Sequence, residues 1–506
     1  MSNPPTQPEK AAPVEQILQL RREKKNRLLA EGKTPYGHRF QRSHVLADAV
    51  AAFDPLVPKG EEAHNFVHPD EVKLAGRLMT RRDLGKLCFA HLKDHSGQIQ
   101  LKVNKQDVGE VAYKEFVKDV DLGDILAVTG KMCRTKTGEL TVQVLSFEIL
   151  SKSLRPWPEK YHGMTDSELR SRQRELDLAT NDESKIRFLT RSRIVDSIRQ
   201  TLREAKFIEV ETPLMQAVAG GALAKPFITH HEALDLQLYM RIAPELFLKR
   251  LIVGGFDRVY EIGRAFRNEG IDTRHNPEFT IMEAYQAYGD VNDMMDLAER
   301  LIQGAAKAIG VSEVTYREQK CRVDQPFDRA SLVDLFKKFL NVDFIELCRT
   351  NQWSDAAHAA GISIPKNTPE GKCFDLMFDE KILPHLDKPT FVLDYPSAVS
   401  PLAKTKPGQP LLADRFELFL AKEEVANAYT EQNDPDIQRQ KFADELGKRG
   451  KGDEEAMPTD EEFVTALEHG MPPAGGLGIG IDRLTMILTG TASIREVILF
   501  PLLKPQ

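Results

Sequence analysis

The spacing of hydrophobic residues changes along the chain and divides it into regions of different structure. From Val14 to Glu31 the apolar positions recur with a helical period and the segment ends at Gly32, which predicts a helical arm. Farther on, Ile99, Leu101 and Val103 alternate with polar residues. A period of two is the pattern of a half-buried strand, so the region from about 70 to 150 is predicted to be built mainly from short strands.

One helix interrupts these strands. Residues 105–120 place apolar side chains at helical intervals, after the third predicted strand and before the fourth. Five short strands with a helix after the third is the order of an OB-fold barrel, which often binds single-stranded nucleic acid. Residues 66–150 are therefore expected to form an OB-fold domain.

The remainder of the chain predicts a different architecture. Residues 151–182 have the composition of a linker followed by a polar helical segment. A long helix is expected over 183–205, with the apolar positions Ile186, Leu189, Ile194, Ile198 and Leu202. Strands and helices then mix without regular alternation, which favours an α+β domain around an antiparallel sheet. The predicted organisation is an arm (1–65), an OB-fold domain (66–150), a linker (151–182) and a catalytic domain (183–506).

Composition narrows the class of protein without identifying it. The 506 residues include five scattered cysteines and no CxxC motif, which disfavours a disulfide framework and a structural zinc. No apolar run approaches the roughly 20 residues of a membrane helix, and the polar N-terminus does not resemble a secretory signal. A cytoplasmic protein without a membrane partner is expected. The net charge of −7 argues against a non-specific nucleic-acid coat but leaves room for a local basic surface.

A candidate basic surface lies on the N-terminal helix. Its basic residues are Arg21, Arg22, Lys24, Lys25 and Arg27. The pattern fits a tRNA-binding stripe and a solvated helix face about equally well.

The segment 258–285 predicts a hairpin with an unusual set of side chains. In extended arms residues two apart share a face, so Arg267 lies with Glu269, and Glu283 lies with Tyr285. An ordinary surface hairpin with cross-strand ion pairs is the simpler interpretation of any one of these residues, but not of the whole set.

Glycines alternate in the segment 474–490. Gly476, Gly478 and Gly480 leave one face of a strand bare, which lets a flat group approach the backbone. Arg483 follows near the start of a helix, where anions are favoured. A strand packed tightly under a helix would show the same pattern, and the spacing is not that of a dinucleotide-binding loop.

Acidic residues recur in the segment 414–434. Glu417 and Glu424 near a phosphate site would suit Mg²⁺, which prefers oxygen ligands. In extended geometry Asn427, Tyr429 and Glu431 share a face, whereas Glu424 lies on the opposite face unless a bulge intervenes. A solvated acidic stripe on a helix remains the alternative.

These segments closely resemble the signature motifs of class II aminoacyl-tRNA synthetases, and specifically of bacterial-type lysyl-tRNA synthetases. Residues 207–213, ending at Pro213, resemble motif 1, residues 266–283 resemble motif 2, and residues 476–483 resemble motif 3. The resemblance extends from about residue 66 to the C-terminus. The class I signatures HIGH and KMSKS and a P-loop are absent from the sequence.

The resemblance implies an activity and a set of site residues. It implies activation of L-lysine with ATP, transfer to tRNA(Lys), and a homodimer that includes Pro213. Arg267 and Arg483 would be catalytic, and Glu417 and Glu424 would hold Mg²⁺. The positions implied for ATP are Arg267, Glu269, His275, Asn276, Phe279, Glu417, Glu424, Gly480 and Arg483. Those implied for lysine are Gly221, Glu245, Arg267, Glu283, Tyr285, Asn427, Tyr429 and Glu431, and those for the anticodon are Phe89, Gln100 and Glu139.

The charge of the implied pocket independently favours lysine. A buried ammonium needs countercharge and hydrogen-bond acceptors, which Glu283, Glu431 and Tyr285 could supply. A synthetase for aspartate or asparagine is the nearest alternative, and an aspartate pocket would need a cation there. The related ligase for elongation factor P lacks the OB-fold domain, and a non-catalytic paralogue would be expected to have lost Arg267 or Arg483.

Overall fold

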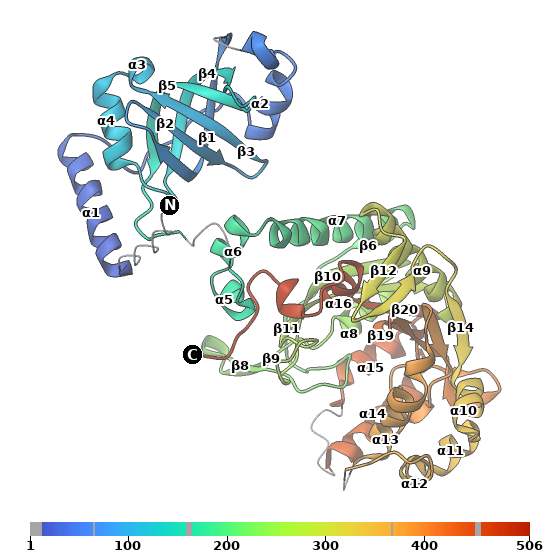
Figure 1. Cartoon of the computed structure of the whole chain (residues 1–506). Helices are drawn as coiled ribbons and strands as arrows, with labels where there is room; N and C mark the ends of the chain where they lie inside the picture. The colour runs from blue at the N-terminus through green and yellow to red at the C-terminus, as the bar shows by residue number, and fades with distance from the viewer. Residues whose placement is uncertain (1–12, 64–65, 158–163, 366–367, 451–456, 506) are drawn as a thin grey trace. The chain divides into compact units, whose positions relative to one another are not determined.

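The computed structural model describes residues 13–63, 66–157, 164–365, 368–450 and 457–505, so the polar segment at the extreme N-terminus lies outside the described residues. The chain divides into two compact units, Met1–His162 and Gly163–Gln506 (Figure 1). No helix among the described residues is both long and apolar enough to cross a membrane.

The first unit contains the predicted OB-fold barrel. Its strands are β1 (Val67–Asp83), β2 (Leu87–Lys93), β3 (Gln98–Asn104), β4 (Ile125–Arg134) and β5 (Leu140–Ser151), closed in the order β1-β2-β3-β5-β4. Closure follows from the period of two, because Leu92, Leu101 and Val103 are completely buried inside the barrel. The OB-fold prediction is confirmed.

The helical segments of this unit differ in detail from the prediction. They are α1 (Val14–Ala30), α2 (Leu46–Phe53), the 3-10 turn η1 (Gly60–Ala63), α3 (Lys105–Val108) and α4 (Glu110–Asp119). The single helix expected over 105–120 is divided because Gly109 adopts φ 86°, outside the helical region. Val111, expected on the apolar face, is 80% exposed.

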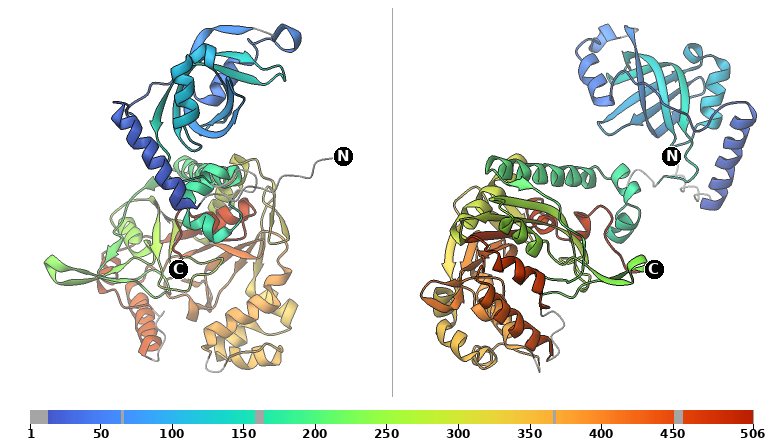
Figure 2. Two further views of the ribbon diagram at one scale, coloured as in Figure 1. Left: turned by 60° about the vertical axis from the view of Figure 1, so that its left-hand side comes forward. Right: turned by 180° about the vertical axis from the view of Figure 1, so that it is seen from behind.

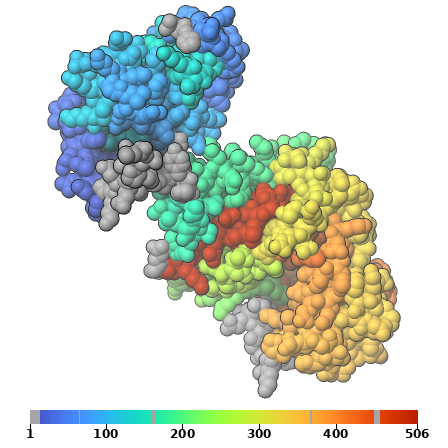
Figure 3. Space-filling model, in the orientation of Figure 1, coloured from blue at the N-terminus to red at the C-terminus, as the bar shows by residue number. Residues whose placement is uncertain are grey.

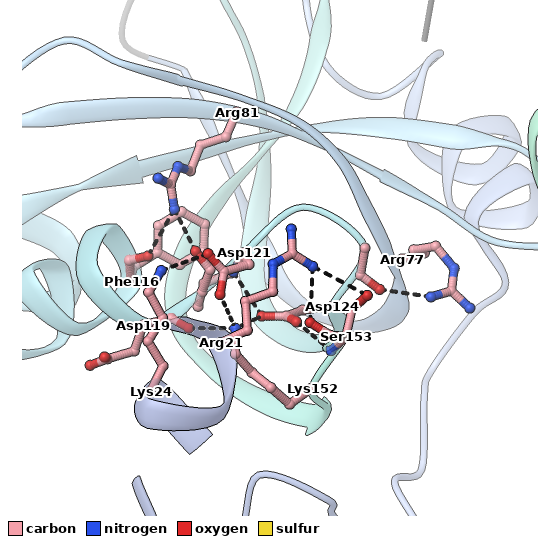
Figure 4. A network of polar contacts seen from close by, with 12 residues as sticks. Arg21, Lys24, Arg77, Arg81, Phe116, Asp119, Asp121, Asp124, Lys152 and Ser153 are labelled. Atoms are coloured by element: carbon pink, nitrogen blue, oxygen red, sulfur yellow. Dashed lines mark hydrogen bonds and ion pairs between the residues drawn. The ribbon is translucent and has the colours of Figure 1, made fainter. Parts of the chain in front are cut away.

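Helix α1 is attached to the barrel through its basic residues. Arg21 donates to the carbonyl oxygens of Ser153 (2.9 Å) and Arg155 (3.0 Å), and Lys24 pairs with Asp121 at 2.6 Å (Figure 4). Arg27 pairs with Asp119 in the same way. Three of the five basic residues considered for a tRNA-binding stripe are therefore occupied within the unit, which favours a docking role for this face of the helix.

A buried ammonium lies at the centre of this polar cluster. Lys152 Nζ, on a side chain with no exposed surface, donates to Asp119 O (2.7 Å), Asp121 Oδ2 (2.5 Å) and Asp124 Oδ2 (2.7 Å) (Figure 4). All three donors of the ammonium are satisfied, so burial of this charge is compensated. The cluster joins α1, the segment that precedes β4 and the end of β5.

The second unit is built on an eight-stranded mixed sheet of the order β14-β15-β18-β19-β20-β11-β10-β6, most of whose pairings are antiparallel. Its strands are β6 (Ile208–Glu209), β10 (Arg258–Phe266), β11 (Glu278–Ala287), β14 (Asp328–Ser331), β15 (Thr390–Leu393), β18 (Arg415–Leu420), β19 (Glu423–Thr430) and β20 (Ala474–Gly480). Smaller sheets contain β7 (Met215–Gln216), β8 (Ile228–His231), β9 (Leu236–Met240), β12 (Glu313–Tyr316), β13 (Gln319–Arg322), β16 (Thr405–Lys406) and β17 (Gln409–Ala413). This is the α+β architecture that the sequence predicts.

Helices surround this sheet. They are α5 (Ser167–Arg172), α6 (Arg174–Thr180), α7 (Asp182–Glu204), α8 (Glu245–Val253), α9 (Val291–Ala308), α10 (Leu332–Leu340), α11 (Phe344–Thr350), α12 (Trp353–Ala359), α13 (Glu370–Lys381), α14 (Pro435–Gly450), α15 (Glu461–Glu468) and α16 (Ile481–Leu488). The 3-10 turns are η2 (Glu232–Leu234), η3 (Leu383–His385), η4 (Ser397–Val399) and η5 (Ile494–Glu496). Helices α5 and α6, within the predicted linker, group with the second unit.

The sheet has one apolar face and one polar face. Met282, Ala284, Leu477 and Ile479 point to one side, where they form a core with residues of α7, α9 and α16. Figure 2 shows α7 as the long green helix along one side of the second unit. Their neighbours along β11 and β20 point to the other side, because side chains alternate along a strand. That second face carries the polar residues of the motifs.

The long helix α7 buries the predicted apolar face only from Ile194 onward. Phe188, Ile194, Ile198 and Leu202 are buried, but Ile186 is 60% exposed and Leu189 is 52% exposed. A helical period gives the relative positions of the apolar residues but does not determine which side of the helix faces the core. In α7 the buried side includes Phe188.

The C-terminal segment packs between other parts of the second unit. In Figure 3 it lies, in red, between the green α5–α7 region and the yellow segment that follows α9. The buried Arg174 holds it by donating to Leu499 O (2.9 Å) and Arg495 O (2.8 Å). These bonds hold the C-terminal segment beside α6, the helix that contains Arg174.

Candidate active site

Strand pairing aligns the candidate residues in two rows across the polar face of the sheet. The first row is Glu417, Asn427, Gly478 and Glu283, and the second is Arg415, Tyr429, Gly476 and Tyr285. Residues paired across antiparallel strands lie on the same face, so β18, β19 and β11 contribute side chains to one surface and β20 contributes bare glycine backbone. The glycines lie in the middle of both rows and leave a trough between the polar groups.

A bulge brings Glu424 onto this surface. Leu418 pairs with Ala426 but Phe419 pairs with Glu424, so Val425 is an extra residue in β19. One extra residue reverses the alternation on either side of it. Glu424 therefore faces the same side as Glu417 and Asn427, which resolves the question that the sequence left open.

The trough opens into a cavity of about 440 Å³. The predicted ATP positions that line it are Arg267, Glu269, His275, Asn276, Phe279, Glu424, Gly480 and Arg483. The predicted lysine positions that line it are Gly221, Glu245, Arg267, Glu283, Tyr285, Asn427 and Tyr429. Glu417 and Glu431 are not part of the lining, although both adjoin residues that are. Arg267 and the amino-acid positions thus share one cavity.

One end of the cavity offers cations and an aromatic surface. The Arg267 guanidinium lies 5.1 Å from the centre of the Phe279 ring, and its buried Nε atom has no hydrogen-bond partner. Arg483 donates to the carbonyl oxygen of Glu424 at 2.7 Å. Asn276 is buried, and its Oδ1 atom also has no hydrogen-bond partner. Unsatisfied polar atoms at a cavity wall indicate that a polar ligand completes the site.

Two carboxylates adjoin this cationic end. Glu417 accepts from Arg415 Nη2 at 2.5 Å and from the Tyr395 hydroxyl at 2.8 Å. Burial and the neighbouring charge of Glu424 raise the pKa of Glu417 to about 7, although Arg415 opposes the shift. A divalent cation between these carboxylates would relieve that repulsion.

The opposite end of the cavity is acidic. The Tyr285 hydroxyl donates to Glu283 at 3.0 Å, and the Tyr429 hydroxyl donates to Glu245 at 2.6 Å. Burial, together with the charge of Glu245, raises the pKa of Glu283 to about 8. A buried carboxylate with a raised pKa, such as Glu283, is expected in a site that receives an ammonium group.

Behind this acidic end lies a cation that the sequence analysis missed. Lys249 pairs with Glu245 at 2.6 Å and also with Glu431, and all three side chains are almost fully buried. A signal was present, because Lys249 lies four residues after Glu245, a spacing that places two side chains on one face of a helix such as α8. Arg415 was missed for a different reason, since only the pairing of β18 with β19 places it beside Asn427.

Gly476 separates Glu431 from Tyr285. A Cβ atom added there would lie 1.9 Å from Glu431 Oε1 and 2.6 Å from Tyr285 Cε1, closer than atoms can approach. The bare strand face predicted from the glycine pattern is required here for packing as well as for access.

Replacing Gly476 by alanine is therefore expected to displace Glu431 and Tyr285. We expect kcat/KM for the amino-acid substrate to fall at least about tenfold, with a loss of about 1–3 kcal/mol in the free energy of unfolding from overpacking. Amino-acid-dependent exchange of pyrophosphate into ATP and thermal denaturation measure the two effects. Gly447→Ala in α14, where a Cβ meets nothing within 4 Å, is the control. Equal activity in both variants would contradict the packing described here.

The remaining predicted positions lie outside this cavity. In the first unit Gln100 Nε2 donates to Glu139 at 2.5 Å, and His91 lies 3.2 Å from the same carboxylate. Phe89 is two residues before His91 on β2, so both side chains point outward from the barrel. Pro213 is exposed in the second unit beside Leu214 and Met215, which are 43% and 55% exposed.

Comparison with known families agrees with this fold and site. The family described as tRNA synthetases class II (D, K and N) matches residues 166–504, and the OB-fold nucleic acid binding domain matches residues 72–150. The fold and the cavity are those of a class II tRNA synthetase.

Full-length relatives narrow the family further. The chain is 50% identical over 494 residues to the lysine–tRNA ligase of Carboxydothermus hydrogenoformans, covering 97% of this chain and 99% of the relative. It is 49% identical over 490 residues to that of Bacillus subtilis, covering 97% of each chain. The match to the Moorella thermoacetica lysine–tRNA ligase is 48% over 491 residues, covering 97% and 98%. The chain belongs to the lysine–tRNA ligase family.

Proposed function

We propose that the protein activates L-lysine with ATP and transfers it to the 3′ end of tRNA(Lys). The observation that carries this proposal is the cavity, where Arg267 lies at one end and buried carboxylates lie at the other. A lysine in this cavity has its carboxylate near the arginine and its ammonium groups near Glu245 and Glu283. An aspartate side chain would meet like charge there, which disfavours the alternative synthetases for aspartate and asparagine.

The first step needs positioning more than a side-chain nucleophile. A carboxylate oxygen of lysine attacks the α-phosphorus of ATP in line, the bond to the leaving oxygen breaks, and pyrophosphate departs, leaving lysyl-adenylate. Arg267 would neutralise the α-phosphate and the lysine carboxylate, while Phe279 and Arg483 would hold the adenine between them. Electrostatic stabilisation and alignment account for catalysis of this kind.

The second step transfers the lysyl group. A terminal ribose hydroxyl of tRNA attacks the acyl carbon of the adenylate, its proton leaves, and AMP is released. The outward-facing Phe89, Gln100 and Glu139 of the OB-fold unit are the proposed anticodon contacts. An aromatic ring beside amide and carboxylate groups suits unpaired bases, which stack and present their edges.

The residues at the cationic end also fit a magnesium ion. Glu417 and Glu424 would hold it, and burial together with the charge of Glu424, which raise the pKa of Glu417, support a cation between them. Within the described part of the chain no group of three or more His, Cys, Asp or Glu side chains is arranged to hold a metal. Mg²⁺ commonly binds through one or two carboxylates and keeps waters and substrate phosphates as its other ligands, so two are sufficient. When bound, the ion would neutralise phosphate charge.

The proposal extends to assembly and location. Exposed apolar residues around Pro213, including Ile208, Leu214 and Met215, support a homodimer interface at this edge. All five cysteines are free, which agrees with a cytoplasmic setting. The division into a helical arm, an OB-fold domain, a linker and a catalytic domain remains part of the proposal.

The proposed activity is tested by exchange of labelled pyrophosphate into ATP with each amino acid in turn, followed by charging of tRNA(Lys). We expect exchange with lysine and none with aspartate or asparagine. Exchange driven only by aspartate or asparagine, or by no amino acid, would overturn the proposal.

Replacing Gln100 by alanine is expected to separate the two steps. Loss of a base contact of this kind costs about 1–3 kcal/mol, so kcat/KM for tRNA(Lys) should fall about tenfold or more while pyrophosphate exchange is unchanged. Lys136→Ala, in the turn between β4 and β5 of the same unit, is the control. If Gln100→Ala charged tRNA(Lys) as well as the unsubstituted protein does, this face would not read the anticodon.

A further inference from the structure

Lys249 is an internal ammonium placed against the acidic end of the cavity. It lies one turn after Glu245 on α8, and its Nζ atom pairs with Glu245 Oε1 at 2.6 Å and with Glu431. Its side chain is 1% exposed, so these contacts are shielded from solvent. A buried ammonium is stable only where such partners are fixed in place.

Neighbouring elements enclose this ammonium. The rings of Tyr429 on β19 and Phe463 on α15 lie 5.5 Å and 5.8 Å from Nζ. Tyr429 also donates to the oxygen of Glu245 that Lys249 contacts. Lys441 on α14 binds carbonyl oxygens of Ser400 and Ala403 instead of carboxylates. Lys249 is therefore held between two carboxylates, and each carboxylate is oriented by it.

This arrangement leaves acceptor atoms available to a ligand. Glu431 Oε1 is buried without a hydrogen-bond partner and lies against Gly476 in the cavity wall. Glu245 itself lines the cavity. Fixing one side of each carboxylate with Lys249 directs the other side toward the space where the amino acid would lie.

The charges of the cluster correspond to those of lysine. Glu245, Glu283 and Glu431 contribute three negative charges when ionised and Lys249 contributes one positive charge, which leaves two. Free lysine carries two ammonium groups, while its carboxylate would face Arg267. Without Lys249 the same cluster would hold one uncompensated charge more than the substrate can neutralise.

We propose that Lys249 is a positioning residue for the amino-acid substrate, which orients Glu245 in the cavity wall and Glu431 behind it and sets the charge of the pocket to match lysine. This inference rests on the proposed function. Lys249 touches the carboxylates and not the reacting atoms, so its effect appears in recognition of lysine and not in binding of ATP.

The pH dependence of lysine recognition reports this role. The groups that face the cluster are Glu245 and Lys249 from α8, Glu283 and Tyr285 from β11, Tyr429 and Glu431 from β19 and its end, and Lys441 from α14. Burial raises the pKa of Glu431 and Lys249 opposes that rise. A carboxylate must lose its proton to pair with an ammonium, so kcat/KM for lysine rises with pH through the pKa values of these carboxylates. Removing the charge of Lys249 moves that rise to higher pH.

The test compares Lys249→Met, Lys249→Arg and the control Lys448→Met, which removes an ammonium paired with Glu445 on α14, by lysine-dependent pyrophosphate exchange from pH 6 to 9. For Lys249→Met we expect KM for lysine to increase about tenfold or more, and the acidic limb of kcat/KM to move up by about one pH unit or more. The dissociation constant for ATP alone should stay within about twofold. Lys249→Arg keeps the charge but not the geometry, so its limb stays in place while KM is intermediate.

Each outcome decides the inference. A pH limb and lysine KM in Lys249→Met equal to those of Lys448→Met would overturn it, as would equal losses for lysine and ATP. If thermal denaturation shows Lys249→Met to be unfolded, Lys249→Arg gives the answer: an unmoved limb with a raised lysine KM supports the inference, and an unchanged KM overturns it. An unsubstituted protein without lysine-dependent exchange would instead refute the proposed function.

Discussion

Replacing Glu431 by glutamine is expected to lower kcat/KM for lysine by about 10²-fold or more. The amide keeps the size of the side chain but removes a charge that pairs with Lys249 and that is proposed to pair with a substrate ammonium. Breaking a buried ion pair by removing one partner costs about 3–5 kcal/mol. The dissociation constant for ATP should change little, because the nucleotide residues lie at the other end of the cavity. Lysine-dependent pyrophosphate exchange measures the loss.

The control for this variant is Glu445→Gln. Glu445 is also a buried carboxylate paired with a lysine, Lys448, at 2.5 Å, but it lies on α14 and does not line the cavity. It should lose some stability and retain lysine activation. If Glu431→Gln activates lysine as well as Glu445→Gln does, the acidic end of the cavity is not the lysine pocket.

Replacing Arg267 by alanine is expected to reduce pyrophosphate exchange by about 10²–10³-fold, the usual effect of removing one preorganised donor from a developing charge. Arg267 lies at the cationic end of the cavity and has an unsatisfied buried Nε atom, and it is proposed to contact both the α-phosphate and the lysine carboxylate, so both substrates would lose a contact. The loss should appear in kcat as well as in the KM values for lysine and ATP. Exchange at saturating and limiting concentrations of each substrate separates these terms.

Arg264→Ala is the matched control for Arg267→Ala. Arg264 lies three residues before Arg267, in β10, but its side chain is 41% exposed and lies 3.5 Å from Glu278. Exposed pairs of this kind contribute about 0–1 kcal/mol, so exchange should stay close to that of the unsubstituted protein. Similar activity in the two arginine variants would place the α-phosphate elsewhere.

Periodicity predicted the strands of both units because each has one buried face. The hairpin of β10 and β11, the glycine strand β20 and the pair β18 and β19 follow the alternation seen in the sequence. Strand order could not be derived in the same way, since pairing of β19 with β20 and of β20 with β11 joins segments far apart in the chain. The rows of the active site depend on those pairings.

Helix faces were less predictable than helix existence. The helical period of α7 was correct, but the buried stripe includes Phe188 and excludes Ile186 and Leu189. In α1 the basic residues suggested a binding surface, whereas Arg21, Lys24 and Arg27 attach the helix to the barrel. Which side of a helix meets the protein depends on tertiary contacts that a single segment does not contain.

The candidate site shows the same difference between what the sequence predicts and what depends on tertiary contacts. The residues named by resemblance mostly line one cavity, but Glu431 lies behind it and already has a cationic partner in Lys249. Resemblance indicates which positions matter and leaves open what each one touches before substrate arrives. The pairing of Lys249 with Glu431 depends on the packing of α8 against the end of β19, which joins segments far apart in the sequence.

The extra residue in β19 has a consequence for how the enzyme tolerates change. Val425 interrupts the strand between Glu424 on one side and Asn427 and Tyr429 on the other. Glu424 is proposed to bind the metal near the phosphates, and Asn427 and Tyr429 are proposed to bind the amino acid. Deleting Val425 would shift the strand by one residue. The side chain of Glu424 would then turn toward the hydrophobic core, while Asn427 and Tyr429 would keep their places on the polar face. The relative placement of the ATP-binding and lysine-binding residues thus depends on one extra residue, Val425, which contacts neither the phosphates nor the ammonium groups in the proposed mechanism.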